Sequence, residues 1–156
     1  MTHEVLDLIS ECQRLTGYDS FLETGMGTGE RLQQIIARQK FHVVRGVEYD
    51  YEQYKQARLR FREELQKSVW LYYGPSTRLL KHMMAATSKC VILLAPLQQN
   101  ARRRELDIIF TQVGPSPLPV IIVQASEALD CFALLPPAKY KRLEQSDYVA
   151  FLPASQ

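Results

Sequence analysis

Three glycines at alternate positions, Gly25, Gly27 and Gly29, follow a short apolar run that ends in the acidic residue Glu23. Glycine permits backbone angles with positive φ and lets main-chain N–H groups come close to a ligand. A helical pattern begins directly after the last glycine. A strand, a glycine turn and a helix in this order are typical of a phosphate- or nucleoside-binding turn in doubly wound α/β proteins. A tight turn that binds no ligand is the alternative.

A second acidic residue, Glu48, ends the next predicted strand, roughly 20 residues after the glycines. A carboxylate at this place can accept hydrogen bonds from both hydroxyl groups of a ribose. Taken alone, Glu48 is also compatible with a solvated strand end. Together with the glycine turn, it favours a ligand that contains a nucleoside.

The segment from Glu23 to Gly29 resembles the first motif, (D/E)xGxGxG, of the Rossmann-like (class I) S-adenosylmethionine (SAM)-dependent methyltransferases. Dinucleotide-binding oxidoreductases favour the spacing GxGxxG instead. The resemblance extends over the order of elements from Phe21 to Val123 and is specific over residues 21–49. It implies a short and divergent member of this superfamily, with SAM as its cofactor.

The resemblance also implies which residues contact SAM. The glycine turn would face the methionine part, the end of the second strand would face the ribose, and the turn after the third strand would lie near the adenine. Several relatives carry an acidic residue where this chain has Pro75, so Ser76 is the residue that can replace the hydrogen bond to the adenine amine. The implied cofactor-binding residues are Glu23, Gly25, Met26, Gly27, Gly29, Glu48, Tyr49, Gly74 and Ser76.

The turns after the predicted fourth and fifth strands, at 95–98 and 124–126, lack carboxylates. A divalent metal needs several hard oxygen ligands, so the sequence predicts no metal site. A general base to deprotonate an acceptor is also missing there. Because the sulfonium of SAM is already activated, methyl transfer can depend mainly on alignment and desolvation.

Candidates for a catalytic role at the pocket rim are Tyr18, Tyr72 and His82, with Glu127 as a further residue. Each has a structural alternative. Tyr72 has the character of a residue packed between sheet and helix, and His82 that of a half-exposed helix residue. Glu127 is interpreted as a solvated loop residue. Tyr18 precedes the first strand and would have to close over the ligand.

The basic run Arg102–Arg104 would lie in the first turn of a helix, where the helix dipole disfavours cations. We interpret it as a solvated helix face, with an anionic partner as the alternative. The net charge of +2 is too small to indicate binding to nucleic acid or to an anionic membrane.

Strands and helices alternate along the chain. Predicted strands cover 21–24, 42–48, 69–73, 90–94, 119–124 and 148–152, and the predicted helices include 50–67 and 139–145. This order predicts right-handed βαβ units in a three-layer α/β/α sandwich, with a mostly parallel, doubly wound sheet of about six or seven strands. The predicted single domain has an N-terminal helix at 4–16, a core with the motifs at 20–125, and a short C-terminal helix and strand at 138–153.

The composition of the 156-residue chain is that of a soluble domain, with 46% hydrophobic and 23% charged residues. Three widely separated cysteines, Cys12, Cys90 and Cys131, predict reduced thiols in a cytoplasmic protein. The N-terminus lacks the features of a signal peptide, and the longest apolar run, 90–97, is too short to cross a bilayer.

These observations favour a small SAM-dependent methyltransferase that acts on a small molecule without a metal. One alternative is a catalytically silent protein of the same fold with a binding or regulatory role. Another is a nicotinamide-dependent oxidoreductase, which the glycine spacing disfavours. Because so little of the chain is left to cover the pocket, a homodimer that completes the site is also predicted.

Overall fold

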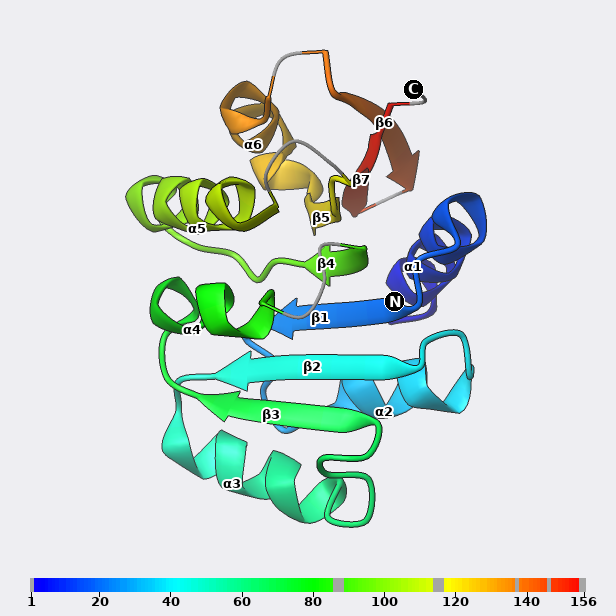
Figure 1. The fold of residues 1–156 in the computed structure, drawn as a ribbon, viewed down its shortest axis with the longest axis vertical. Helices are drawn as coiled ribbons and strands as arrows, with labels where there is room; N and C mark the ends of the chain where they lie inside the picture. The colour runs from blue at the N-terminus through cyan, green and yellow to red at the C-terminus, as the bar shows by residue number, and fades with distance from the viewer. Residues whose placement is uncertain (1, 86–88, 114–116, 137, 146, 155–156) are drawn as a thin grey trace.

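The computed structural model describes residues 2–85, 89–113, 117–136, 138–145 and 147–154. Within these residues one seven-stranded sheet runs in the order β3-β2-β1-β4-β5-β7-β6, with β1 between β2 and β4 (Figure 1). The strands are β1 Ser20–Thr24, β2 Val43–Glu48, β3 Val69–Tyr73, β4 Cys90–Leu93, β5 Val120–Gln124, β6 Tyr140–Gln145 and β7 Tyr148–Pro153. The first five strands are parallel, and β7 is antiparallel to both β5 and β6.

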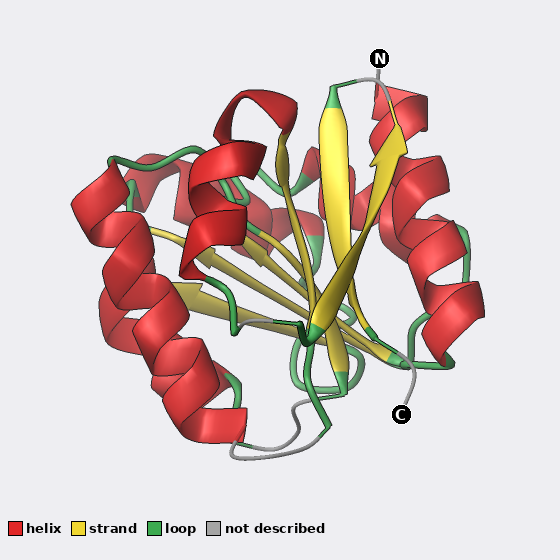
Figure 2. Cartoon of the chain, turned by 90° about the horizontal axis from the view of Figure 1, so that it is seen from above, coloured by secondary structure: helices red, strands yellow, loops and turns green. Residues whose placement is uncertain are grey.

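Helices cover both faces of the sheet (Figure 2). They are α1 Thr2–Thr16, α2 Glu30–Ala37, α3 Tyr51–Arg60, α4 Ser76–Met83, α5 Gln99–Val113 and α6 Ala128–Leu134, with a 3₁₀ turn η1 at Ala125–Glu127. One apolar cluster joins α1, α2 and α3 to the sheet, and a second joins α4, α5 and α6 to the opposite face. The predicted three-layer sandwich is therefore confirmed.

The central strands β1 and β4 are buried along their whole length. Burial on both faces favours a continuous apolar run, which β4 has, whereas β1 also buries the polar residues Ser20, Glu23 and Thr24. The strand order reverses between β1 and β4, because β2 and β3 lie on one side and β4 and β5 on the other. In such sheets the crevice beyond the carboxyl ends of the strands at this reversal binds ligands.

The C-terminal part differs from the prediction. Residues 139–145 do not form a helix, because Tyr140–Gln145 is strand β6, paired antiparallel with β7. Its charged side chains Lys141, Arg142 and Glu144 are exposed, as suits the edge of a sheet. The sequence also missed α6, and the helix predicted over 50–67 ends at Arg60.

The three cysteines are buried and carry free thiols. Burial raises the pKa of Cys12 and Cys90 to about 12, so that both thiols stay protonated at neutral pH. In the part of the chain that the structure describes, no helix is long and apolar enough to cross a membrane.

Candidate functional site

The glycine turn connects β1 to α2 at the carboxyl edge of the sheet. Gly25 has a φ of 62°, and a Cβ on this residue would lie 2.7 Å from the Cβ of Ala95, in the turn after β4. Gly29 caps α2 with a φ of 88°, and a Cβ there would lie 2.7 Å from the ring of Phe61. Glycine is therefore required for the close approach of two turns at Gly25 and for the packing of two helices at Gly29.

Met26 lies in the same turn, with its main chain bonded to β2 and its side chain buried. Its N–H donates to the carbonyl oxygen of Val47 at 3.1 Å, which ties the turn to β2. Its side chain is only 4% exposed and packs over Gly46, where an added Cβ would meet its sulfur. Met26 therefore fixes the glycine turn against β2.

Glu48, at the end of β2, is held by main-chain N–H groups on both carboxylate oxygens. Oε1 accepts from Gly27 at 2.8 Å, and Oε2 accepts from Tyr49 at 3.0 Å and from Asp50 at 2.8 Å. A carboxylate has about four acceptor positions, so one remains on Oε1. The side chain is fixed in direction and keeps a place for one more donor.

A cleft of about 530 Å³ opens beside Glu48, within the size range of small-molecule sites. It brings together five of the predicted cofactor-binding residues from the ends of β1, β2 and β3: Gly25, Glu48, Tyr49, Gly74 and Ser76. Ala95, Pro96 and Leu97 form its opposite wall. Residues from four turns thus surround a single cleft, which we call the β2–β4 cleft.

A second hollow, of about 330 Å³, lies on the other side of the glycine turn. Its lining includes Glu23, Gly27 and Arg31, and it shares Gly25 with the β2–β4 cleft. We call it the glycine-turn hollow. A smaller hollow of about 110 Å³ is also lined by Glu23, Gly25 and Arg31. Its lining includes Gln124 at the end of β5 and Tyr148 at the start of β7.

Glu23 is 2% exposed and is paired with Arg31 on α2, whose Nη1 donates to Oε2 at 2.9 Å. Burial raises the pKa of Glu23 to about 7, against the opposing effect of Arg31 and with a smaller contribution in the same direction from Glu48. Glu23 therefore lies at the border between its charged and neutral forms at neutral pH.

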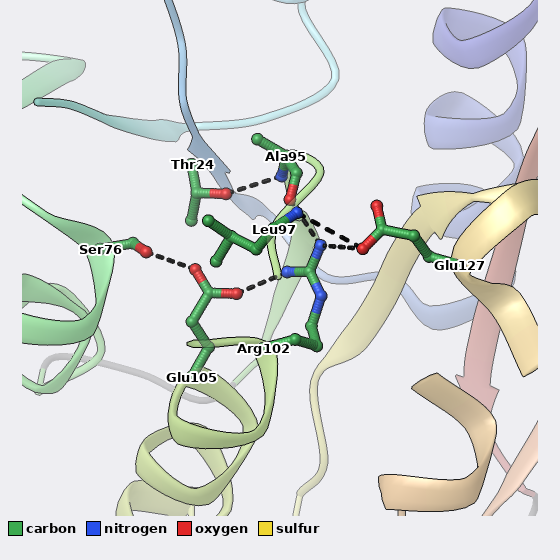
Figure 3. A network of polar contacts seen from close by, with 7 residues as sticks. All are labelled: Thr24, Ser76, Ala95, Leu97, Arg102, Glu105 and Glu127. Carbon is green, nitrogen blue, oxygen red and sulfur yellow. Dashed lines mark hydrogen bonds and ion pairs between the residues drawn. The ribbon is translucent and has the colours of Figure 1, made fainter. Parts of the chain in front are cut away.

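The Ser76 hydroxyl does not face the cleft freely, because it donates to Glu105 on α5. Glu105 is also paired with Arg102, one turn earlier on the same helix (Figure 3). Arg102 donates in addition to the carbonyl oxygen of Ala95 and, at 3.1 Å, to Glu127. This Arg102 network connects α4, α5, η1 and the turn after β4.

Two predictions about charged residues are wrong. Arg102 is not part of a solvated face, since it is 3% exposed, whereas Arg103 and Arg104 are exposed. Glu127 is not a solvated loop residue, because its Oε1 accepts from Arg102. Arg102 lies three residues before Glu105, on the face of α5 that carries the apolar stripe of Leu106 and Ile109, and this spacing was the signal available in the sequence.

The candidate catalytic side chains do not reach the site. Tyr18 precedes β1, and its hydroxyl donates at 2.7 Å to the carbonyl oxygen of Leu118, which precedes β5. It therefore lies at the amino edge of the sheet, opposite the glycine turn. Tyr72 and His82 pack ring edge to ring face, with centroids 5.8 Å apart, and line none of the hollows at the carboxyl edge. Among the described residues, no group of His, Cys, Asp and Glu could hold a metal ion.

Solved structures share this arrangement of strands and helices. The methyltransferase domain of bacterial CtHen1-C matches with a TM-score of 0.72 and 14% identity, over 97% of this chain and 98% of that chain. The chain has the fold of the Rossmann-like SAM-dependent methyltransferases. The SAH-bound methyltransferase PaMTH1 of Podospora anserina has a TM-score of 0.70 and 12% identity, over 97% of this chain and 78% of that one.

A further methyltransferase-fold relative is the precorrin-6y C5,15-methyltransferase of Geobacter metallireducens, with a TM-score of 0.67 and 12% identity over 95% of this chain and 84% of that one. No family model matches the chain, and no curated protein sequence matches it. Three-dimensional similarity therefore establishes the fold, although the sequences are only 12–14% identical.

Proposed function

We propose that this protein binds SAM along the carboxyl edge of its sheet and transfers the methyl group to a small-molecule acceptor without a metal. The observation that carries the proposal is Glu48. Its carboxylate is fixed by three main-chain N–H groups at the wall of the β2–β4 cleft and retains an acceptor position. A ribose hydroxyl is the donor that suits this position in a SAM site.

The two cavities that meet at Gly25 match the two halves of SAM. The adenosine half occupies the β2–β4 cleft, with Tyr49 and the turn at Gly74 on either side of the base. The methionine half occupies the glycine-turn hollow, beside Glu23. PaMTH1, a structure of the same fold, was solved with the product SAH bound, which supports a cofactor of this kind.

SAM bound here would supply an activated methyl group. The lone pair of the acceptor would form the new bond to the methyl carbon as the carbon–sulfur bond breaks, and SAH would be released as a neutral thioether. The sulfonium supplies the driving force, so that the residues here contribute by holding the donor in line and excluding water. An acceptor with a lone pair that is free at neutral pH needs no base for the attack.

Calorimetric titration with SAM, SAH and NAD tests the ligand part of the proposal. We expect SAM and SAH to bind and NAD not to bind. Binding of NAD in preference to SAM, or binding of none of the three, would overturn it. Formation of SAH during incubation with SAM and a panel of small-molecule acceptors tests the transfer step.

A catalytically silent SAM-binding protein is the second candidate. Glu105 and Glu127, the carboxylates near β4 and β5, are both paired with Arg102. Neither is therefore a free base that could deprotonate an acceptor, which favours a protein without transfer activity. SAM binding without SAH formation across the acceptor panel would support this second function against the first.

A cytoplasmic location and a homodimer complete the proposal. The free thiols of the three cysteines suit a reducing compartment. A second copy of the chain would cover the open side of the site. Sedimentation of the purified protein as a monomer with full transfer activity would rule out the dimer as a requirement.

A further inference from the structure

Arg31 is a residue that the sequence motifs did not single out. It lies in the first turn of α2, just beyond the glycine turn, and donates to Glu23 at 2.9 Å. A cation in the first turn of a helix is disfavoured by the helix dipole, so its position requires another favourable interaction. The bond to Glu23 provides one, and the surroundings of Arg31 indicate a second.

The Glu23–Arg31 pair is incompletely satisfied. Among the described residues, neither Oε1 of Glu23 nor Nε of Arg31 has a hydrogen-bond partner, although both atoms are buried. Buried polar atoms without partners are costly, and in folded proteins they occur where a ligand or water completes the bonding. The pair thus has both an acceptor and a donor to spare.

The two residues of the pair line cavities. Glu23 and Arg31 both line the glycine-turn hollow and the smaller hollow next to it. The Arg31 side chain remains 30% exposed, so part of it is open to a molecule in these hollows. Gly25 connects them to the β2–β4 cleft, so that one ligand can extend through both cavities.

The charges define the chemistry of the ligand. A carboxylate directly beside a guanidinium is complementary to an ammonium directly beside a carboxylate, which is an α-amino acid group. Arginine binds carboxylates with two parallel hydrogen bonds, whereas a carboxylate accepts from an ammonium through either oxygen.

We propose that Arg31 recognises the α-carboxylate of the methionine part of SAM, while Glu23 accepts from its ammonium group. This inference rests on the proposed function and adds a specificity residue to it. Arg31 makes the site select SAM and SAH over adenosine thioethers or sulfonium compounds that lack the carboxylate.

The test compares three ligands on the unmodified protein by calorimetry: SAM, decarboxylated SAM and methylthioadenosine. Removal of the carboxylate should weaken binding by roughly tenfold to a hundredfold, the range of a charge-assisted hydrogen bond. Decarboxylated SAM keeps the sulfonium, the ammonium and the adenosine, so the difference from SAM reports the carboxylate alone. This comparison does not depend on any variant folding correctly.

The variant Arg31→Met should lower the affinity for SAM to that for decarboxylated SAM and leave the affinity for decarboxylated SAM unchanged within about twofold. Arg38→Met is the matched control, because Arg38 caps the other end of α2 and pairs with Asp7 on the surface. It should change none of the three affinities.

Equal binding of SAM and decarboxylated SAM by the unmodified protein would overturn the inference while leaving SAM binding intact. An equal loss of affinity for all three ligands in Arg31→Met would also overturn it, because it would indicate a structural role. Failure of every ligand to bind the unmodified protein would instead remove the proposed function itself.

Discussion

At the carboxyl edge of the sheet, the charged residues near β1 and β2 make different contacts from those near β4 and β5. On the side of β1 and β2, Glu23 and Glu48 end their strands and line the cavities, and each keeps an unused acceptor position. On the side of β4 and β5, Glu105 and Glu127 come from α5 and η1 and are both bound to Arg102. Glu48 is held by main-chain N–H groups alone, whereas Glu105 and Glu127 are held by the side chain of Arg102 and help to fix the turn after β4. Glu105 also lines the β2–β4 cleft, and among the described residues Oε2 of Glu127 has no hydrogen-bond partner.

This difference indicates that the ligand-binding and the supporting parts of the site are separate. The Arg102 network fixes the turn at Ala95–Leu97 through the carbonyl oxygen of Ala95, and Thr24 accepts from the Ala95 N–H at 2.8 Å. That turn forms one wall of the β2–β4 cleft. The network therefore shapes the cleft, and its member Glu105 is also part of the lining.

The largest expected effect comes from removing the charge at the centre of the network. Arg102→Met leaves Glu105 and Glu127 without their cation, and breaking a buried pair in this way costs about 3–5 kcal/mol of unfolding free energy. Denaturant unfolding measures it. Arg103→Met, on the exposed face of the same helix, should stay within about 0.5 kcal/mol. Equal stability of the two variants would contradict the supporting role of Arg102.

Glu23 should make stability depend on pH. Its pKa rises from 4.5 to about 7 on folding, so folding favours the protonated form. The resulting contribution to stability is fully present below pH 4.5 and is lost as the pH rises to 7, by about 3 kcal/mol. Unfolding free energies of the protein and of Glu23→Gln at pH 5 and pH 7.5 measure it. The difference between the two proteins should change with pH, and a constant difference would contradict the buried titration.

Gly25→Ala tests the close approach between the glycine turn after β1 and the turn after β4. The positive φ of Gly25 costs about 1–2 kcal/mol for alanine, and the contact with Ala95 at 2.7 Å adds to this cost. Gly17→Ala is the control, because Gly17 has a φ of 71° and open space around it. We expect Gly25→Ala to lower the melting temperature more than the control and to weaken SAM binding, which Gly17→Ala should not affect.

The smallest effect is expected at Tyr49, which lines the β2–β4 cleft but is 74% exposed. Loss of its ring contact with the adenine in Tyr49→Ala should reduce SAM affinity by about 0.5–1.5 kcal/mol, with little change in stability. Replacement by Phe should restore the affinity. An unchanged affinity in Tyr49→Ala would exclude the ring from the site.

The sequence predicted the parts of the site that are local in the chain. The glycine turn and Glu48 are short patterns at strand ends, and the fold brings five of the named residues to one cleft. Arg31 and Arg102 were not predicted as site residues. The three-residue spacing from Arg102 to Glu105 was visible in the sequence, but the contacts of Arg102 with Ala95 and Glu127, and that of Arg31 with Glu23, join different elements. Tyr18 was misplaced because a residue before a parallel strand lies at the amino edge, away from the ligand crevice.

The error at β6 has a similar cause. Tyr140–Gln145 contains several charged residues, which disfavour a buried strand, but the segment forms the exposed edge of the sheet next to β7. Only the long-range pairing with β7 determines its conformation. The core strands β4 and β5 were predicted well because their nearly continuous apolar character reflects burial on both faces.

The most direct test of the proposed SAM site is the affinity of SAM for the protein and for Glu48→Ala, measured by calorimetry at neutral pH. We expect SAM to bind the unmodified protein and Glu48→Ala to lose roughly tenfold to a hundredfold in affinity. Glu52→Ala, which removes an exposed carboxylate from nearby α3, should bind as tightly as the unmodified protein. Equal affinity in Glu48→Ala and Glu52→Ala would contradict the assignment of the β2–β4 cleft as the SAM site.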